Sequence, residues 1–475
     1  MVGAGAAGLY VAVRAAEEGA RVTLVSRKRL AESVSESASY WAQGGLAAAL
    51  APDDSPERHA DDTLNAGRGL CRTEAVEALV RAAPGAVAEL ADRGVGFDAE
   101  PDGTLALALE GGHTARRIVH AGGSATGKAL TDRLIELVEA EPRIEVRERT
   151  SAVALWSDGS RCAGVVTGDG TVAAAATVLA TGGAAALWRR TTNPWGAIGA
   201  GAIMAHAAGA ALSDLEFCQF HPTALALPGS DHDGTLLTEA LRGEGARLLD
   251  ASGRRFTDEL GPRDQVTAAI LDRIEADDTD HVRLDVRGID PDRFPNVFAA
   301  CRAAGLAPER EPVPVAPAAH YLMGGVVCDL DGRTTLPGLY AVGECACSGL
   351  HGANRLASNS LTECFVFGAR AAIAAARAPR ADESVPRPGW RFEPPTAATR
   401  EAVWRHAGPR RSVATLEPPL DDPYPLARLI ARVALERRES RGPHRRTDFP
   451  LPDGAFDGVH LVIGPDGEPR REPWP

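Results

Sequence analysis

Lysines, aromatic side chains and long apolar runs are scarce in this chain. Two lysines, Lys28 and Lys128, stand among 51 basic residues, which indicates a GC-rich genome rather than a function. No apolar run approaches the roughly 20 residues that a membrane-spanning helix needs. No secretory signal peptide is visible either. We therefore expect no membrane segment and no export.

Charge and cysteine content narrow the class of protein further. The net charge of −13 argues against a nucleic-acid partner. Eight cysteines scattered over 475 residues are typical of a reducing cytoplasm. Cys345 and Cys347 have too few companions for a metal site, so we predict no metal. The length exceeds that of one ordinary core and predicts about two to four domains.

A glycine-rich segment, VGAGAAGL at residues 2–9, opens the chain and is typical of dinucleotide binding. Gly3 allows the tight turn, Gly5 the close approach of a pyrophosphate, and Gly8 the close packing of helix on strand. The run 9–18 reads as a helix whose N-terminus faces the phosphates, and 22–25 reads as the next parallel strand. Ser26 stands where an acidic ribose ligand is usual, which argues against a standard NAD site.

The strand that should precede this loop is almost missing, because only Met1 and Val2 come before Gly3. In a doubly wound sheet that strand lies in the middle, and its loss would leave a hole in a buried sheet. We therefore expect that the native start lies upstream and that a short apolar strand has been lost.

Two later segments also have the character of a flavin site. The apolar run 174–183 ends in Thr181, Gly182 and Gly183, and the run 336–344 ends in Gly343 and Glu344. Glu344 is placed to hydrogen-bond a ribose, and a helix beginning near Ser358 would direct its N-terminus at the flavin. The fold class is therefore predicted as α/β, with a discontinuous Rossmann-like FAD-binding domain at 1–214 and 321–385. We expect an inserted α+β capping domain at 215–320 and a short C-terminal helical domain at 386–475, helical at 426–439.

The predicted cap and its hinges carry residues suited to a small dicarboxylate. Such a ligand needs cationic, fork-shaped donors at both ends, a geometry that arginine provides. Singly, His221 or His320 is more often a structural histidine, and Arg263 beside Asp264 could be a local ion pair. Their joint occurrence beside a flavin scaffold favours a substrate site. His221 precedes a proline, so the chain there is expected to be extended. Thr238 and Glu239 stand at one helix start and Arg263 at another, and the site is completed by His320 and Arg355.

Seven motifs together carry a resemblance to a known family. They are YWAQGG at 40–45, EGGH at 110–113, QFHPT at 219–223, LTEALRGEG at 237–245, HY at 320–321, GANRLASNS at 352–360 and ESRGPHRRTDFP at 439–450. From Gly3 to Asp448 the chain resembles the L-aspartate oxidases, within the succinate dehydrogenase and fumarate reductase flavoprotein superfamily. The resemblance implies FAD-dependent oxidation of L-aspartate to iminoaspartate, the first step of de novo NAD biosynthesis. It also implies flavin reoxidation by O2, which gives H2O2, or by fumarate, and consumption of the product by quinolinate synthase.

The same resemblance implies roles for individual residues. His221, His320, Thr238 and Arg355 would hold the two carboxylates, and Glu110 would orient the amine. Arg263 would donate or accept a proton, with Glu239 or Asp264 as a carboxylate relay. Ala38 stands where relatives with covalent flavin carry a histidine, so FAD would be held non-covalently. The cofactor-binding residues would be Gly3, Ala4, Gly5, Ala6, Ala7, Gly8, Ser26, Arg27, Ala38, Ser39, Tyr40, Trp41, Ala42, Gln43, Gly44, Gly45, Thr181, Gly182, Gly183, Gly343, Glu344, Asn359, Ser360 and Leu361.

Some positions depart from the family pattern and leave two alternatives. Ala200 and Ser124 replace aspartates that are common in the family, and the region between Trp404 and Leu426 is short. One alternative is a degraded, non-catalytic homologue. The other is a soluble flavoprotein of the fumarate reductase or succinate dehydrogenase type, against which Ala38 and Glu110 argue.

Overall fold

A parallel β-sheet lies at the centre of the lobe that carries the glycine loop. The computed structural model describes residues 1–33, 37–379 and 393–474. Across this sheet the order is β16 (Leu339–Ala341), β9 (Thr177–Leu179), Val2, β1 (Val22–Val25) and β5 (Ile144–Arg147). The strand predicted at 22–25 is thus confirmed, and the run 174–183 contributes a shorter strand than expected.

The first residues of the chain occupy the central position of this sheet. The N–H of Val2 donates to Val178 O at 2.9 Å and that of Gly3 donates to Val25 O at 3.1 Å. On the β9 side, Ala180 N–H also donates to Val2 O at 2.9 Å. Val2 therefore bridges β9 and β1 as a single residue, and the loss of a longer strand upstream stays a prediction.

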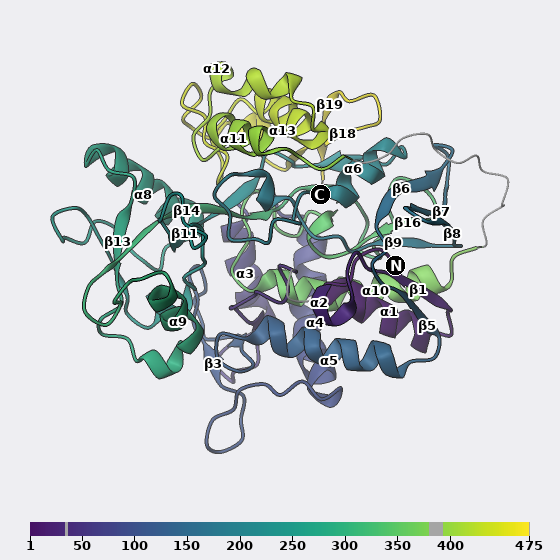
Figure 1. Ribbon diagram of the computed structural model, residues 1–475, viewed down its shortest axis with the longest axis horizontal. Helices are drawn as coiled ribbons and strands as arrows, with labels where there is room; N and C mark the ends of the chain where they lie inside the picture. The colour runs from purple at the N-terminus through teal and green to yellow at the C-terminus, as the bar shows by residue number, and fades with distance from the viewer. Residues whose placement is uncertain (34–36, 380–392, 475) are drawn as a thin grey trace.

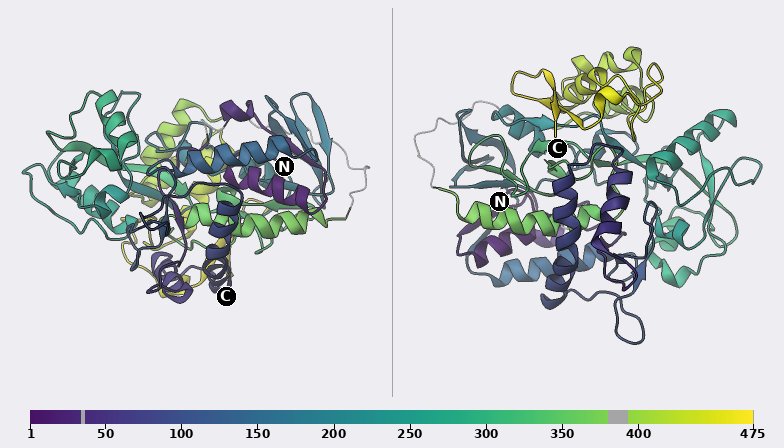
Figure 2. Two further views of the ribbon diagram at one scale, coloured as in Figure 1. Left: turned by 90° about the horizontal axis from the view of Figure 1, so that it is seen from below. Right: turned by 180° about the vertical axis from the view of Figure 1, so that it is seen from behind.

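Helices α1 (Ala6–Glu17), α5 (Thr126–Ala140) and α10 (Asn359–Ala376) lie side by side against this sheet (Figures 1 and 2). The helix predicted at 9–18 begins three residues earlier, since Gly5 is its N-cap. The buried apolar faces of α1 and α10 meet at Tyr10 and Phe365, whose rings pack edge to face at 5.1 Å. This packing fixes the glycine loop and the helix start near Ser358 in one lobe.

The segment expected as a cap forms a separate antiparallel sheet, seen at the left of Figure 1. Its strand order is β11 (Cys218–Leu225), β14 (Val313–Leu322), β13 (Val282–Asp285) and β12 (Arg247–Leu249). The helices α7 (Ala240–Gly243), α8 (Arg263–Ala276) and α9 (Pro295–Ala303) accompany it. Strands β11 and β14 lead back to the FAD-type lobe, so they bring side chains of the cap to the boundary between the lobes.

The C-terminal segment combines helices with a β-hairpin, at the top of Figure 1. Helices α11 (Ala397–His406), α12 (Val413–Leu416) and α13 (Pro425–Glu436) precede β18 (Val459–Ile463) and β19 (Pro469–Pro473). Strand β18 pairs with β10 (Leu212–Ser213), in a sheet that continues through β15 (Gly325–Val327) and β17 (Ala346–Cys347). The segment is thus less helical than predicted. The expected domain boundary at 385/386 lies outside the described residues.

Shorter elements complete the fold around these three parts. A helical pair, α3 (Pro56–Ala66) and α4 (Thr73–Asp92), packs against α10. Within the described ranges, no helix is both long enough and apolar enough to cross a bilayer. The remaining elements are α2 (Leu30–Ser33), β2 (Leu46–Ala47), β3 (Leu107–Ala108), β4 (Ile118–Val119), β6 (Ala152–Ser157), β7 (Cys162–Thr167), β8 (Gly170–Ala173), α6 (Ala200–Ala207) and the 3-10 turns at Ala185–Leu187, Pro291–Arg293, Gly343–Cys345, Pro418–Asp421 and Gly454–Phe456.

Candidate active site

One cavity of about 620 Å³ runs from the glycine loop to the base of the cap. Its size is within the range of cofactor and substrate sites. All seven residues that the sequence marks as catalytic line it: Glu110, His221, Thr238, Glu239, Arg263, His320 and Arg355. Most of the predicted cofactor residues line it as well. Four predicted cofactor residues do not line the cavity: Ala6, Gly8, Tyr40 and Asn359.

The glycine loop has the close contacts that a pyrophosphate site requires. Gly3 has φ +106°, and a Cβ there would lie 2.4 Å from Ala180 O. A Cβ on Gly8 would lie 2.0 Å from Gly3 O, so this glycine allows helix α1 to pack on the loop. Ser39 closes the loop by accepting a hydrogen bond from Ala6 N–H at 3.2 Å. The N-terminus of α1 therefore faces the cavity with glycine on the approach, as phosphate binding demands.

Polar atoms farther along the cavity fit the rest of a flavin nucleotide. Within the described part of the chain, Ser26 Oγ and Gln43 Oε1 are buried without a hydrogen-bond partner. Both residues line the cavity, and buried polar groups are normally paired. Glu344 accepts from Leu322 N–H at 3.0 Å, and burial raises the pKa of its carboxyl to about 7. The unpaired oxygens and the glycine cradle are matched to a ligand with many hydroxyl and amide groups.

Two histidines form the wall on the cap side. His221 lies on β11 and His320 on the neighbouring β14, with ring centroids 5.1 Å apart. Burial, together with the charge of Arg263, holds the pKa of each imidazole well below its usual range. Thr223 N–H donates to His221 Nδ1 at 3.3 Å, which leaves the proton of a neutral ring on Nε2. The His221 imidazole can therefore present its Nε2–H group without carrying charge.

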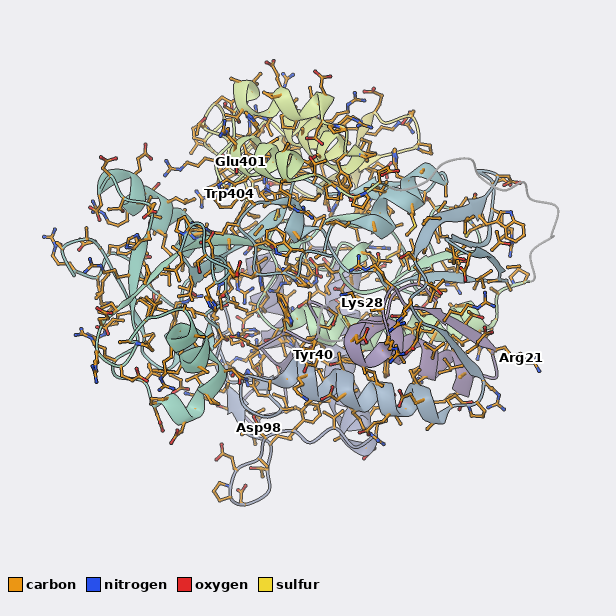
Figure 3. All side chains as sticks on the ribbon, in the orientation of Figure 1. Arg21, Lys28, Tyr40, Asp98, Glu401 and Trp404 are labelled. Atoms are coloured by element: carbon orange, nitrogen blue, oxygen red, sulfur yellow. The ribbon has the colours of Figure 1, made fainter. Side chains whose placement is uncertain are left out.

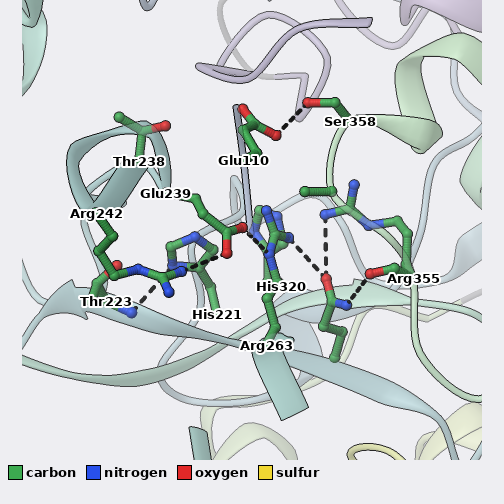
Figure 4. A network of polar contacts seen from close by, with 12 residues as sticks. Glu110, His221, Thr223, Thr238, Glu239, Arg242, Arg263, His320, Arg355 and Ser358 are labelled. Atoms are coloured by element: carbon green, nitrogen blue, oxygen red, sulfur yellow. Dashed lines mark hydrogen bonds and ion pairs between the residues drawn. The ribbon is translucent and has the colours of Figure 1, made fainter. Parts of the chain in front are cut away.

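Arg263 and Glu239 line the cavity and form a polar network with Arg242, which lies behind them (Figure 4). Arg263, the first residue of α8, donates from Nε to Glu239 Oε2 at 2.7 Å. Arg242 donates to the other oxygen of Glu239 at 2.7 Å, so this buried carboxylate lies between two guanidinium groups. Asp264, the other relay candidate, is instead held by Arg68 through two hydrogen bonds of 2.9 Å. Glu239 is therefore the carboxylate that contacts Arg263.

Arg355 is oriented together with Arg263 through a shared amide. Gln219 Oε1 accepts from Arg263 at 2.9 Å and from Arg355 at 3.3 Å. Its Nε2 donates to Asn354 Oδ1 at 2.9 Å, so the amide orientation is determined by its partners. Burial and the nearby Arg263 lower the pKa of Arg355 to about 10, which still leaves it cationic at neutral pH. Two positive charges thus face one part of the cavity.

Glu110 lies across the cavity from these arginines (Figure 4). Burial alone would raise the pKa of its carboxyl, but His120, Ser358 and Arg263 outweigh burial and bring the pKa to about 2. Ser358 Oγ donates to Glu110 Oε2 at 2.6 Å and accepts from Gly45 N–H at 3.2 Å. The site therefore combines a negative charge with cationic donors, which suits a ligand with two carboxylates and an ammonium group.

Several residues at the site were missed from sequence. Gln219 and Arg242 lie within the motifs around His221 and Glu239, and the three-residue spacing of Glu239 and Arg242 is a usable signal on a helical turn. Thr192 holds His320 through a 2.7 Å contact to Nδ1, and Asn193 Nδ2 donates to His320 O at 2.6 Å. No sequence signal pairs those two residues with a histidine more than 100 positions away.

Comparisons with known proteins agree with this geometry. Residues 1–361 match the FAD binding domain family, and residues 403–463 match the fumarate reductase flavoprotein C-terminal family. L-aspartate oxidase from Streptomyces coelicolor is 42% identical, over 98% of this chain and 90% of that protein. The enzyme of the same name from Caulobacter vibrioides is 45% identical, over 100% and 96%. A solved structure of a quinol-fumarate reductase with menaquinol molecules superposes with a TM-score of 0.88 at 30% identity, over 99% of this chain and 96% of that one.

Fold, cavity and matches together define an FAD-dependent oxidoreductase with the flavoprotein fold of fumarate reductases. FAD is its cofactor, and the orphaned oxygens and glycine cradle of the cavity fit that group. Within this class, the chain belongs to the L-aspartate oxidase family.

Proposed function

We propose that this chain oxidises L-aspartate to iminoaspartate as the first step of de novo NAD biosynthesis. The observation that carries the proposal is Glu110, a buried carboxylate with a pKa of about 2, opposite Arg263 and Arg355. Succinate and fumarate have no positive group for such a carboxylate, whereas L-aspartate has an ammonium. Names of relatives over nearly the whole chain support the same reaction.

The proposed binding mode follows from charge and donor geometry. Arg355, His221, His320 and Thr238 hold the two carboxylates, and Glu110 accepts from the ammonium group. Bound FAD supplies the two-electron acceptor, while these residues fix the substrate against it and exclude water. Ala38 has no nucleophilic atom, which supports non-covalent FAD.

Arg263 is proposed as the group that moves the proton. A guanidinium normally stays protonated, so this role needs a low-dielectric site and a nearby base. Burial of Arg263 and its 2.7 Å contact with Glu239, itself paired with Arg242, support such a relay.

The setting of the reaction is also part of the proposal. Oxygen, which would become hydrogen peroxide, or fumarate takes up the electrons, and quinolinate synthase uses the unstable product. We propose a cytoplasmic protein with FAD-binding segments 1–214 and 321–385, a cap at 215–320 and a C-terminal domain at 386–475.

Anaerobic mixing of the FAD-loaded protein with L-aspartate, and separately with succinate, tests the proposal. We expect L-aspartate to bleach the visible flavin absorbance, and air to restore it with formation of peroxide. Glu110→Gln should slow bleaching by L-aspartate while succinate still binds as an inert ligand. Bleaching by succinate alone would move the chain to the succinate dehydrogenase type. No bleaching by either compound, with FAD bound, would indicate a non-catalytic homologue.

A further inference from the structure

A buried polar cluster lies directly behind Arg355 and has no part in the mechanism above. It consists of Tyr321, at the end of β14, His351, and Glu363 on α10, each less than 7% exposed. Glu363 Oε2 accepts from the Tyr321 hydroxyl at 3.2 Å and lies 3.0 Å from His351 Nε2. The cluster thus ties the cap strand β14 to the flavin-side helix α10.

The ring of Tyr321 is the surface on which Arg355 rests. The guanidinium carbon of Arg355 lies 4.7 Å from the ring centroid, within the range of a cation–π contact. Arg355 is 4% exposed, and its Nε is buried without a hydrogen-bond partner among the described residues. At its edge, the guanidinium of Arg355 donates hydrogen bonds to Ser360 Oγ at 2.8 Å and to Gln219 Oε1 at 3.3 Å. The ring therefore provides the support for the face of the guanidinium.

The carboxylate behind the ring adds to this support. Burial, and next the charge of Glu363, raise the pKa of Tyr321 well above its usual range, so the hydroxyl remains a hydrogen-bond donor. A phenol that donates to a carboxylate gains electron density in its ring, and a more negative ring face attracts a cation more strongly. Such contacts are strongest where water is excluded, as it is here.

We infer that Tyr321, held by Glu363 and His351, is a positioning residue that fixes the Arg355 guanidinium for a substrate carboxylate. The inference rests on the proposed carboxylate-binding role of Arg355. Tyr321 acts through Arg355 and takes no part in proton or electron transfer. Its effect should therefore appear mainly in dicarboxylate binding.

The test measures succinate binding and aspartate turnover in Tyr321→Phe and Glu363→Gln. Succinate, as an inert dicarboxylate, is titrated into the FAD-loaded protein while the flavin spectrum reports its dissociation constant. We expect each variant to weaken succinate binding and raise KM for L-aspartate by about three- to thirty-fold, with a smaller change in kcat. Tyr321→Leu, which also loses the ring, should bind succinate more weakly still.

Tyr10→Phe is the matched control. Tyr10 is another buried tyrosine that donates to a carboxylate, Glu89, at 2.9 Å, but it does not line the cavity. This variant should retain FAD and leave the succinate dissociation constant unchanged. FAD content and the flavin spectrum establish that each variant is folded.

Arg355→Gln separates the role inferred for Tyr321 from the role proposed for Arg355. If Arg355→Gln weakens succinate binding while Tyr321→Phe and Glu363→Gln bind it as the parent does, the inference is wrong and the proposed role of Arg355 stands. If Arg355→Gln binds succinate normally, the proposed role of Arg355 in binding a substrate carboxylate is wrong. Equal losses in Tyr10→Phe and Tyr321→Phe would also overturn the inference, because they would reflect general destabilisation.

Discussion

Two buried carboxylates in the cavity have opposite acid–base behaviour because their partners differ. Glu110 has a pKa of about 2, since His120, Ser358 and Arg263 together outweigh the cost of burial. Glu344 has a pKa of about 7, because burial dominates over the N–H groups that it accepts from. At pH 6 the first is a carboxylate that can hold an ammonium, and the second is mainly a neutral acid that can donate a hydrogen bond.

This contrast predicts how the stability of the FAD-free protein depends on pH. The folded-state pKa of Glu344 is raised from 4.5 to about 7, so its contribution is fully favourable below pH 4.5 and is lost as pH rises through 7. We therefore compare the free energy of unfolding of Glu344→Gln with that of the parent. The difference should favour the variant more at pH 8 than at pH 5, by roughly 1–3 kcal/mol. Chemical unfolding at the two pH values measures this difference.

Asp250→Asn is the control for this experiment. Ser252, backbone N–H groups and Arg254 lower the pKa of the Asp250 carboxyl to about 2, so its contribution is complete above the unfolded value and is lost only as pH falls toward 2. None of these partners changes charge between pH 5 and pH 8, so the stability change in Asp250→Asn should be the same at both values. A change in Glu344→Gln that is equally independent of pH would contradict the assignment.

Arg263 should be needed more for turnover than for affinity. Arg263→Ala removes the proposed proton carrier, and we expect kcat to fall by about 10²–10⁴-fold while the succinate dissociation constant changes much less. Arg242→Lys, which keeps a cation beside Glu239, should lose far less activity. Equal losses in kcat and in affinity for Arg263→Ala would limit Arg263 to binding.

At the scale of elements, short contacts at the glycine loop determine where α1 starts. The backbone of Gly3 lies against Ala180, and Gly8 lies against Gly3, so strand position, loop and helix form one unit. Two helix starts position side chains of the proposed substrate site in the same way. Arg263 is the first residue of α8, and Glu239 is the N-cap of α7. Functional groups at helix starts are held by backbone geometry as well as by their own contacts.

Gly3→Ala should disrupt this unit, whereas Gly85→Ala should not. Gly3 has φ +106° and a backbone oxygen 2.4 Å from the added Cβ, so we expect loss of FAD and at least about 2 kcal/mol of stability. Gly85 lies inside α4 with nothing within 4 Å of an added Cβ, and alanine there should stabilise by about 0.5–1 kcal/mol. FAD retention after gel filtration and thermal unfolding measure both effects. Normal FAD binding by Gly3→Ala would refute the loop geometry.

At the scale of the whole molecule, the C-terminal segment is tied to both other parts. Strand β18 pairs with β10 of the FAD-type lobe, while Arg437 reaches Glu216, just before β11 of the cap. Arg437 also contacts Glu439 at 3.1 Å, and all three side chains are fully buried. An ion network without water loses much when a single partner is removed.

Arg437→Ala should therefore destabilise the protein by about 3–5 kcal/mol, because the buried carboxyl of Glu216 would lose its guanidinium partner, whereas Glu439 keeps Arg441. The control is Arg405→Ala, which breaks an exposed pair with Glu401 on α11. Glu401 is labelled in Figure 3. That pair has 69% and 43% exposed side chains, so its loss should cost less than about 1 kcal/mol. Urea unfolding of both variants makes the comparison, and similar losses would contradict a structural role for the buried network.

The sequence by itself determined the local geometry, the family and most of the cavity wall. Strand β1, the start of α8 at Arg263 and the extended chain at His221 follow from glycine, proline and apolar patterns, because these act on neighbouring residues. Tertiary structure alone decided which distant atoms meet. It paired Asp264 with Arg68, joined Arg263 to Arg355 through Gln219, and added a hairpin where helix was expected. Such pairs depend on how separate lobes pack, and no short-range pattern encodes that arrangement.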